Sequence, residues 1–235
     1  MPFRTQKRRM KKKRFYKKKR TYRNRSYPMV LGGFPKSKLV RLRYVQEVRL
    51  DVVAPGPYAR RVFSANSCYD PDVTGVGHQP SNFDRWIDQY KNFTVLGSRL
   101  SAQYVPTSLT SVVPGLVGCI LSTDGATVPA MSGLQDLLEQ PNNSRGRQLT
   151  AGRDIANPFT KVVSKFSASK FFGKNKANVI GDDQLAGTVS TNPVERAYFE
   201  LYMYTLNAND PGPCTFIVTI DYIVLFHDRL QTLDS

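Results

Sequence analysis

The most constraining feature of this 235-residue chain is the separation of its charges along the sequence. Residues 1–46 contain eighteen lysines and arginines and no acidic residue, because the first acid is Glu47. The remaining residues contain sixteen basic and eighteen acidic side chains, so the excess positive charge lies almost wholly before the body of the chain. We therefore expect two parts with different tasks: a disordered basic arm and linker at 1–36, and one folded domain at 37–235.

The arm is too basic to fold alone. Fourteen of its first 26 residues are lysine or arginine, which repel one another and leave few apolar groups to bury. Such side chains neutralise phosphates without reading the sequence, and the aromatic rings at Phe15, Tyr16, Tyr22 and Tyr27 can stack on bases of a single strand. We predict that nucleic acid is bound by the fourteen basic residues Arg4, Lys7, Arg8, Arg9, Lys11, Lys12, Lys13, Arg14, Lys17, Lys18, Lys19, Arg20, Arg23 and Arg25.

Two other interpretations of the arm exist, a solvated tail and a signal that serves only nuclear import. Import signals need about 5–8 basic residues, far fewer than the eighteen present before Glu47. Nucleic-acid binding therefore explains the charge better, and import through residues 11–20 can coexist with it.

The body shows the alternation of apolar and polar residues that is typical of half-buried strands. In 39–53 the apolar positions alternate with Arg41, Arg43 and Arg49, and in 215–228 every second residue is apolar. About eight strands can be placed, with long loops between them, which favours an all-β fold, an eight-stranded antiparallel jelly-roll sandwich. The predicted strands are 39–53, 58–65, 94–105, 116–122, 196–206 and 215–228, and a further segment is placed at 157–172.

One or two short helices are expected among the loops. Ser81 has the character of an N-cap, and Phe83, Trp86, Ile87 and Tyr90 have the spacing of one helical face, which predicts a helix over 81–91. A second short helix is expected around 133–138. We interpret Trp86 as an anchor in the core or at a subunit contact rather than as a residue that stacks on a base.

A second basic segment follows in the body, with no acid between Asp154 and Asp182 and with phenylalanines among its lysines. One interpretation is a contact for single-stranded nucleic acid on an inner surface, through Lys161, Lys165 and Lys170. The other is a solvated strand face with its aromatic rings in the core or at a subunit contact, and we favour it because charge runs are commonly exposed faces. The lysines of the segment are Lys161, Lys165, Lys170, Lys174 and Lys176.

The residues that usually carry catalysis or bind metals are few and scattered. The two histidines, His78 and His227, are far apart, and the three cysteines, Cys68, Cys119 and Cys214, form neither a CxxC motif nor an even disulfide set. No phosphate-binding loop and no nucleophile elbow occurs. We expect no enzyme activity, no metal and no cofactor. Since no run of about 18 apolar residues exists, we also expect no membrane insertion.

Several segments together resemble the capsid proteins of circovirus-like viruses, whose genomes are small circular single-stranded DNA. They are Gly77-His78-Gln79-Pro80 with the aromatic helix behind it, Phe93-Thr94-Val95-Leu96-Gly97-Ser98, Asn157-Pro158-Phe159, Lys165-Phe166 and Phe171-Phe172-Gly173, after a basic start. The arm departs from the family in being rich in lysine as well as arginine.

The resemblance implies a single jelly roll, a T=1 icosahedral shell of 60 identical subunits and an arm that faces inward. It implies a virion protein that packages a viral single-stranded DNA genome and meets the nuclear-import machinery and the nucleus of its host during assembly. A host-cell receptor is implied as well, which the residues do not identify. The alternative is a non-viral nucleic-acid-binding protein with a basic tail, such as a ribosomal-type protein, which explains the arm but not the large β body.

Overall fold

The computed structural model describes residues 35–52, 57–105, 115–131, 133–149, 161–205 and 213–230. The chain divides into two units, Met1–Gly33 and Phe34–Ser235, and all described residues belong to the second. The fourteen basic residues predicted in the arm, from Arg4 to Arg25, lie outside the described residues.

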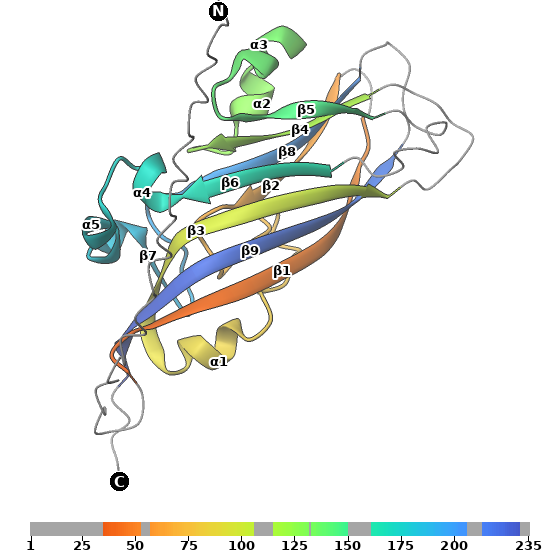
Figure 1. The fold of residues 1–235 in the computed structure, drawn as a ribbon. Helices are drawn as coiled ribbons and strands as arrows, with labels where there is room; N and C mark the ends of the chain where they lie inside the picture. Colours follow the sequence, from red (N-terminus) through yellow and green to blue (C-terminus); the bar gives the residue numbers. More distant parts are fainter. Residues whose placement is uncertain are drawn as a thin grey trace, which may run out of the picture. The chain divides into compact units, whose positions relative to one another are not determined.

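The first sheet contains four long strands and one short one (Figure 1). Its order is β1 (Lys38–Leu50), β9 (Cys214–Arg229), β3 (Tyr90–Val105) and β6 (Lys161–Ser167). The short strand β7 (Ala186–Thr188) pairs with the first part of β3. Every pair is antiparallel, and β9 is paired along nearly its whole length on both sides.

The second sheet has four strands in the order β2 (Tyr58–Ser64), β8 (Tyr198–Thr205), β4 (Gly115–Ser122) and β5 (Asn143–Leu149). It is also antiparallel throughout. Apart from β7, the strand order of the two sheets is that of a jelly roll, which consists of two Greek keys. In this order the first strand, β1, and the last strand, β9, are neighbours. The predicted eight-stranded antiparallel jelly roll is therefore confirmed.

The two inner faces of the sheets form the core. On β9, the inward positions from Phe216 to Phe226 are all buried, while Ile217 and Ile223 on the opposite face are 44% and 47% exposed. Two hydrogen bonds join the layers directly: the Tyr222 hydroxyl donates to the Ser64 carbonyl at 2.7 Å, and the Ser98 hydroxyl donates to the Ala65 carbonyl at 2.5 Å. The free cysteines Cys68, Cys119 and Cys214 are buried in this core.

The strands β8 and β9 correspond to the two predicted C-terminal segments, but they lie in different sheets rather than in one hairpin. Strands β8 and β9, consecutive in the chain, thus belong to opposite layers, as the jelly roll requires. Both faces of β8 are buried from Tyr198 to Met203, because α2 and α3 cover its outer side near Tyr202.

Five short α-helices lie in the described loops, more than the one or two expected: α1 (Phe83–Ile87), α2 (Thr127–Ala130), α3 (Leu134–Glu139), α4 (Ala168–Phe171) and α5 (Lys176–Ile180). A 3-10 turn, η1 (Asp183–Leu185), follows them. The helix predicted around 133–138 is confirmed as α3. None of the helices in the described part of the chain is long and apolar enough to span a membrane.

The helix predicted over 81–91 is shorter than expected. It begins after Asn82, whose backbone is left-handed with φ of 68°, so Ser81 is not its N-cap. It ends at Ile87 because Tyr90 already belongs to β3 and pairs with Arg229. Phe83 and Ile87 are buried as the spacing predicted, and Tyr90 reaches the same core from the strand.

Candidate nucleic-acid interface

The outward face of the first sheet brings together basic side chains from three strands. The alternation on β1 points Arg41, Arg43 and Arg49 away from the core, as the sequence predicted. Register then fixes their neighbours: Arg43 lies beside Asp221 of β9, Asp221 beside Arg99 of β3, and Arg99 beside Lys165 of β6. One row across the sheet therefore carries three cations and a single anion.

The rows on either side extend the same pattern. Glu47, Ile217, Gln103 and Lys161 form another row, so Lys161 and Lys165 share this face. From the row of Arg41 to that of Arg49 the outward positions carry six cations and only two anions. The cations are Arg41, Arg43, Arg49, Arg99, Lys161 and Lys165, and the anions are Glu47 and Asp221. We call this surface the cationic sheet face.

Asp221 organises the β1 side of the cationic sheet face. Arg41 donates to it at 2.9 Å and Arg43 at 2.8 Å, although the two arginine side chains remain 66% and 61% exposed. Burial opposes ionisation of Asp221, but the hydrogen bonds from Arg43 and Arg41 outweigh it and hold the pKa of the carboxyl below its usual range. Two cations are thus fixed by one carboxylate, with positive charge left over.

Arg99, Lys161 and Lys165 are also exposed on this face. Among the described residues, none of the three has a carboxylate within 4.0 Å. Their charges are therefore available to an external anion. Sequence reasoning missed Arg99, because only the pairing of β3 with β6 places it beside Lys165.

The remaining lysines of the second basic segment lie elsewhere. Lys170 is exposed on α4, beside a hollow that Asp124 and Asn142 also line, so the structure does not join it to Lys161 and Lys165. Lys174 is engaged by Asp182 at 2.6 Å and Glu195 at 3.1 Å, and these bonds raise its pKa. Lys176 begins α5.

The phenylalanines of that segment pack on one another. The ring of Phe166 lies 5.6 Å from that of Phe171 and 6.1 Å from that of Phe172, and Phe166 is only 4% exposed. Phe171 and Phe172 are partly buried against the main core. The aromatic rings of the segment therefore pack in the core, whereas the role of the lysines on the strand face stays a prediction.

Two buried carboxylates elsewhere hold loops to the sheets. Glu200 is fully buried and accepts hydrogen bonds from the Ser122 hydroxyl at 2.6 Å and the Thr127 amide at 2.9 Å, with Arg60 at 3.2 Å. Asp72 is likewise buried and bonds Arg61 and Gln46. In the part of the chain that the structure describes, no three His, Cys, Asp or Glu side chains form a group that could hold a metal ion.

Comparison with known proteins gave structural likeness only. No family model matches the chain, and no curated protein matches it. Among solved structures, the 60-mer capsid protein of BFDV (beak and feather disease virus) is similar, at 10% identity and a TM-score of 0.45, over 86% of this chain and 100% of that one. The mud crab tombus-like virus structure is similar at 13% sequence identity and a TM-score of 0.46, over 88% of this chain and 90% of that one. The tobacco necrosis virus structure is similar at 12% sequence identity and a TM-score of 0.43, over 84% of this chain and 85% of that one. At these values the likenesses carry no argument about function.

We predict that the Asp221 cluster stabilises the fold in a pH-dependent way. A carboxyl whose pKa is lower in the folded state stabilises that state above its unfolded pKa of about 3.9, and the effect is lost as the pH falls through the folded pKa. At pH 7 Asp221→Asn should lower the free energy of unfolding by about 1–2 kcal/mol. The difference from wild type should shrink below about pH 4.

Urea denaturation followed by circular dichroism at pH 7, 5 and 3 measures this. Asp51→Asn is the matched control, because it removes the same charge from a looser and more exposed pair, with Arg49 at 3.8 Å. The prediction would be contradicted if both variants lost the same free energy of unfolding at pH 7. It would also be contradicted if the difference between Asp221→Asn and wild type grew toward pH 3.

Proposed function

We propose that this chain is a viral coat protein whose jelly-roll body builds a small closed shell and whose basic arm packages the genome. The observation that carries the proposal is the division of charge: eighteen cations without an acid in residues 1–46, followed by slightly more acids than bases in residues 47–235. A body that carried the arm's charge on its contact surfaces would repel its copies, whereas this one is close to neutral. The arm, by contrast, can bind any partner that carries enough negative charge, such as the phosphates of a nucleic acid.

The arm acts through counterion release. Each lysine or arginine that neutralises a phosphate frees condensed cations into solution, and this drives binding whatever the sequence of the nucleic acid. If sixty copies assemble, as the resemblance to circovirus-like capsid proteins implies, their arms bring roughly a thousand positive charges, enough for a similar number of phosphates. Single-stranded DNA as the genome, the T=1 shell and import into the host nucleus belong to the proposal on the same resemblance.

The cationic sheet face supplies a second contact for the packaged strand. It continues the charge of the arm, since β1 begins at Lys38 and presents Arg41 and Arg43 within its first six residues. Arg99, Lys161 and Lys165 carry the positive surface across the sheet to β6. A strand held first by the arm could then lie along this face through its phosphates.

We predict that removing residues 1–36 leaves a folded body that no longer packages DNA. The body should fold because its described strands all begin at or after Lys38. Packaging should fail because the deletion removes fifteen lysines and arginines and no acidic residue. Circular dichroism tests folding, and nuclease-protected DNA per mole of purified protein tests packaging. Particles of the truncated chain with as much protected DNA as wild type would refute the division of labour.

We predict further that Lys161→Glu combined with Lys165→Glu weakens binding of single-stranded DNA by the full-length protein. The slope of log affinity against log salt should become shallower by about 1.4, the value for two lost phosphate contacts on a single strand. Fluorescence anisotropy of a labelled oligonucleotide across a salt series measures this slope.

The matched control is Lys170→Glu with Lys176→Glu, which makes the same change of charge on α4 and α5, away from the sheet face. If both double variants bind and package like wild type, the sheet face is a solvated surface and the arm alone holds the DNA.

A further inference from the structure

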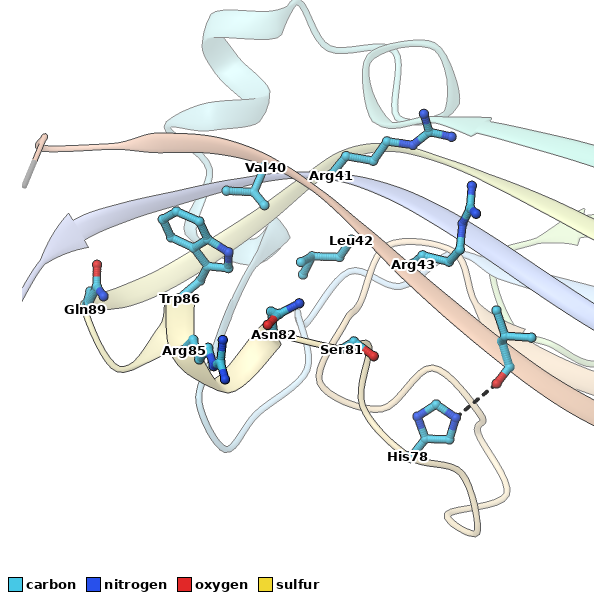
Figure 2. Close-up of a pocket in the computed structure, with 11 residues that line it drawn as sticks. Val40, Arg41, Leu42, Arg43, His78, Ser81, Asn82, Arg85, Trp86 and Gln89 are labelled. Carbon is cyan, nitrogen blue, oxygen red and sulfur yellow. Dashed lines mark hydrogen bonds between the residues drawn. The ribbon is translucent and has the colours of Figure 1, made fainter.

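A groove runs along the outer edge of β1, between this strand and the segment that contains α1 (Figure 2). Its volume is about 690 Å³, within the range of pockets that hold small ligands. The side chains that matter here are Arg41 and Leu42 from β1, and Arg85, Trp86 and Gln89 from the helical segment.

The strand that forms one wall has an open edge. Among the described strands, β1 is the last of its sheet and pairs only with β9, so alternate backbone groups along it face the groove. His78 closes one end, where its Nε2 lies 3.0 Å from the Val45 carbonyl oxygen (Figure 2). Beyond His78 the open edge from Arg43 back toward Val40 lines the groove.

Trp86 forms the aromatic part of the groove. Its ring stacks on Phe226 with centroids 6.2 Å apart and planes at 26°, so one side of the indole is held against the core. The indole is nevertheless only half-buried, and it lines the groove beside Val40 and Leu42 (Figure 2). An aromatic surface held rigidly from behind is a suitable platform for another planar ring.

Gln89 provides a polar group that lacks a partner. Its Oε1 is buried, and within the described ranges no group donates a hydrogen bond to it. A buried acceptor without a donor is costly, so such an atom is a reasonable place for a ligand to donate. The amino and imino groups at the edges of nucleobases are donors of this kind.

The rim of the groove is cationic. Arg85 is exposed and has no carboxylate within 4.0 Å among the described residues. Arg41 and Arg43 line the same groove and also belong to the cationic sheet face. A strand that lies along the sheet face would therefore reach the groove without leaving positive surface.

We propose that this groove binds one nucleotide of the packaged single strand. The base lies against Trp86 and donates to Gln89 Oε1, while the adjoining phosphates contact Arg85 and Arg41. The proposal rests on the proposed packaging function and adds a base-binding site to a surface that otherwise contacts only phosphates. Arg41 and Arg43 belong both to the groove and to the cationic sheet face, where the packaged strand is proposed to lie. This continuity favours a nucleotide of that strand over an extended acidic peptide paired with the open edge of β1.

Trp86 is the only tryptophan in the chain, so its fluorescence reports on this groove alone. Full-length protein is titrated with a thymidine 15-mer and with an abasic 15-mer that has the same phosphates. Both should bind, as measured by anisotropy of labelled copies, because the cations contact the backbone. The thymidine strand should quench Trp86 about twofold more than the abasic strand, because only its bases can stack.

Two variants sharpen the test. Gln89→Leu removes the buried acceptor and Arg85→Gln removes the rim charge, so each should reduce the extra quenching by thymidine. Lys176→Gln is the control, since it removes one exposed charge from α5, which does not line the groove, and it should leave the quenching unchanged.

Equal quenching by both strands, while anisotropy shows both bound, would overturn the groove proposal and leave the packaging function standing. If anisotropy shows that neither strand binds, the packaging function and the groove proposal are overturned together. Quenching that rises with protein concentration without any oligonucleotide would place a second copy of the chain in the groove, and would also overturn the proposal.

Discussion

The pairing of β9 with both of its neighbours is the constraint on which the rest of the structure depends. Thirteen residue pairs join it to β1, from Lys38–Phe226 to Leu50–Cys214, and β3 follows its other edge from Arg229 to Thr215. Because side chains alternate along a strand, this register decides at once which residues enter the core and which face outward. A slip of one residue would bury Arg41 and Arg43 and expose the apolar positions that now form the core.

The same register explains how a nearly neutral body can present a positive surface. Some acids of the body are used within the fold: Glu200 and Asp72 are buried with arginine partners, and Asp182 binds Lys174. Asp221 is the one carboxylate in the row of Arg43, Arg99 and Lys165. Charge is thus balanced over the body but unbalanced on one face, and that face begins where the arm enters the first strand.

Much of the fold could be predicted from the sequence, because strict alternation in 215–228 and 39–53 fits only a strand with one buried face. The weaker points have physical causes. Both faces of β8 are buried, and the polar segment that forms β5 has no apolar face, so neither shows the pattern fully. The helix at α1 stops early because Tyr90, which fits the helical spacing equally well, pairs with Arg229 instead.

The candidate sites were less accessible to sequence reasoning. Lys161 and Lys165 were identified as a pair, but their neighbour Arg99 comes from a distant strand, and only the ladder between β3 and β6 brings it there. Lys170 is close to them in sequence but lies on α4, because β6 ends at Ser167. The groove beside Trp86 depends on the open edge of β1 and on one buried amide oxygen, and no local pattern encodes either feature.

Whether the chain builds a shell around nucleic acid is tested most directly by negative-stain electron microscopy of the purified full-length protein. Uniform closed particles of one size are expected. Isolated monomers or small oligomers at every salt concentration, and also after addition of single-stranded DNA, would contradict it and would indicate a nucleic-acid-binding protein that does not assemble.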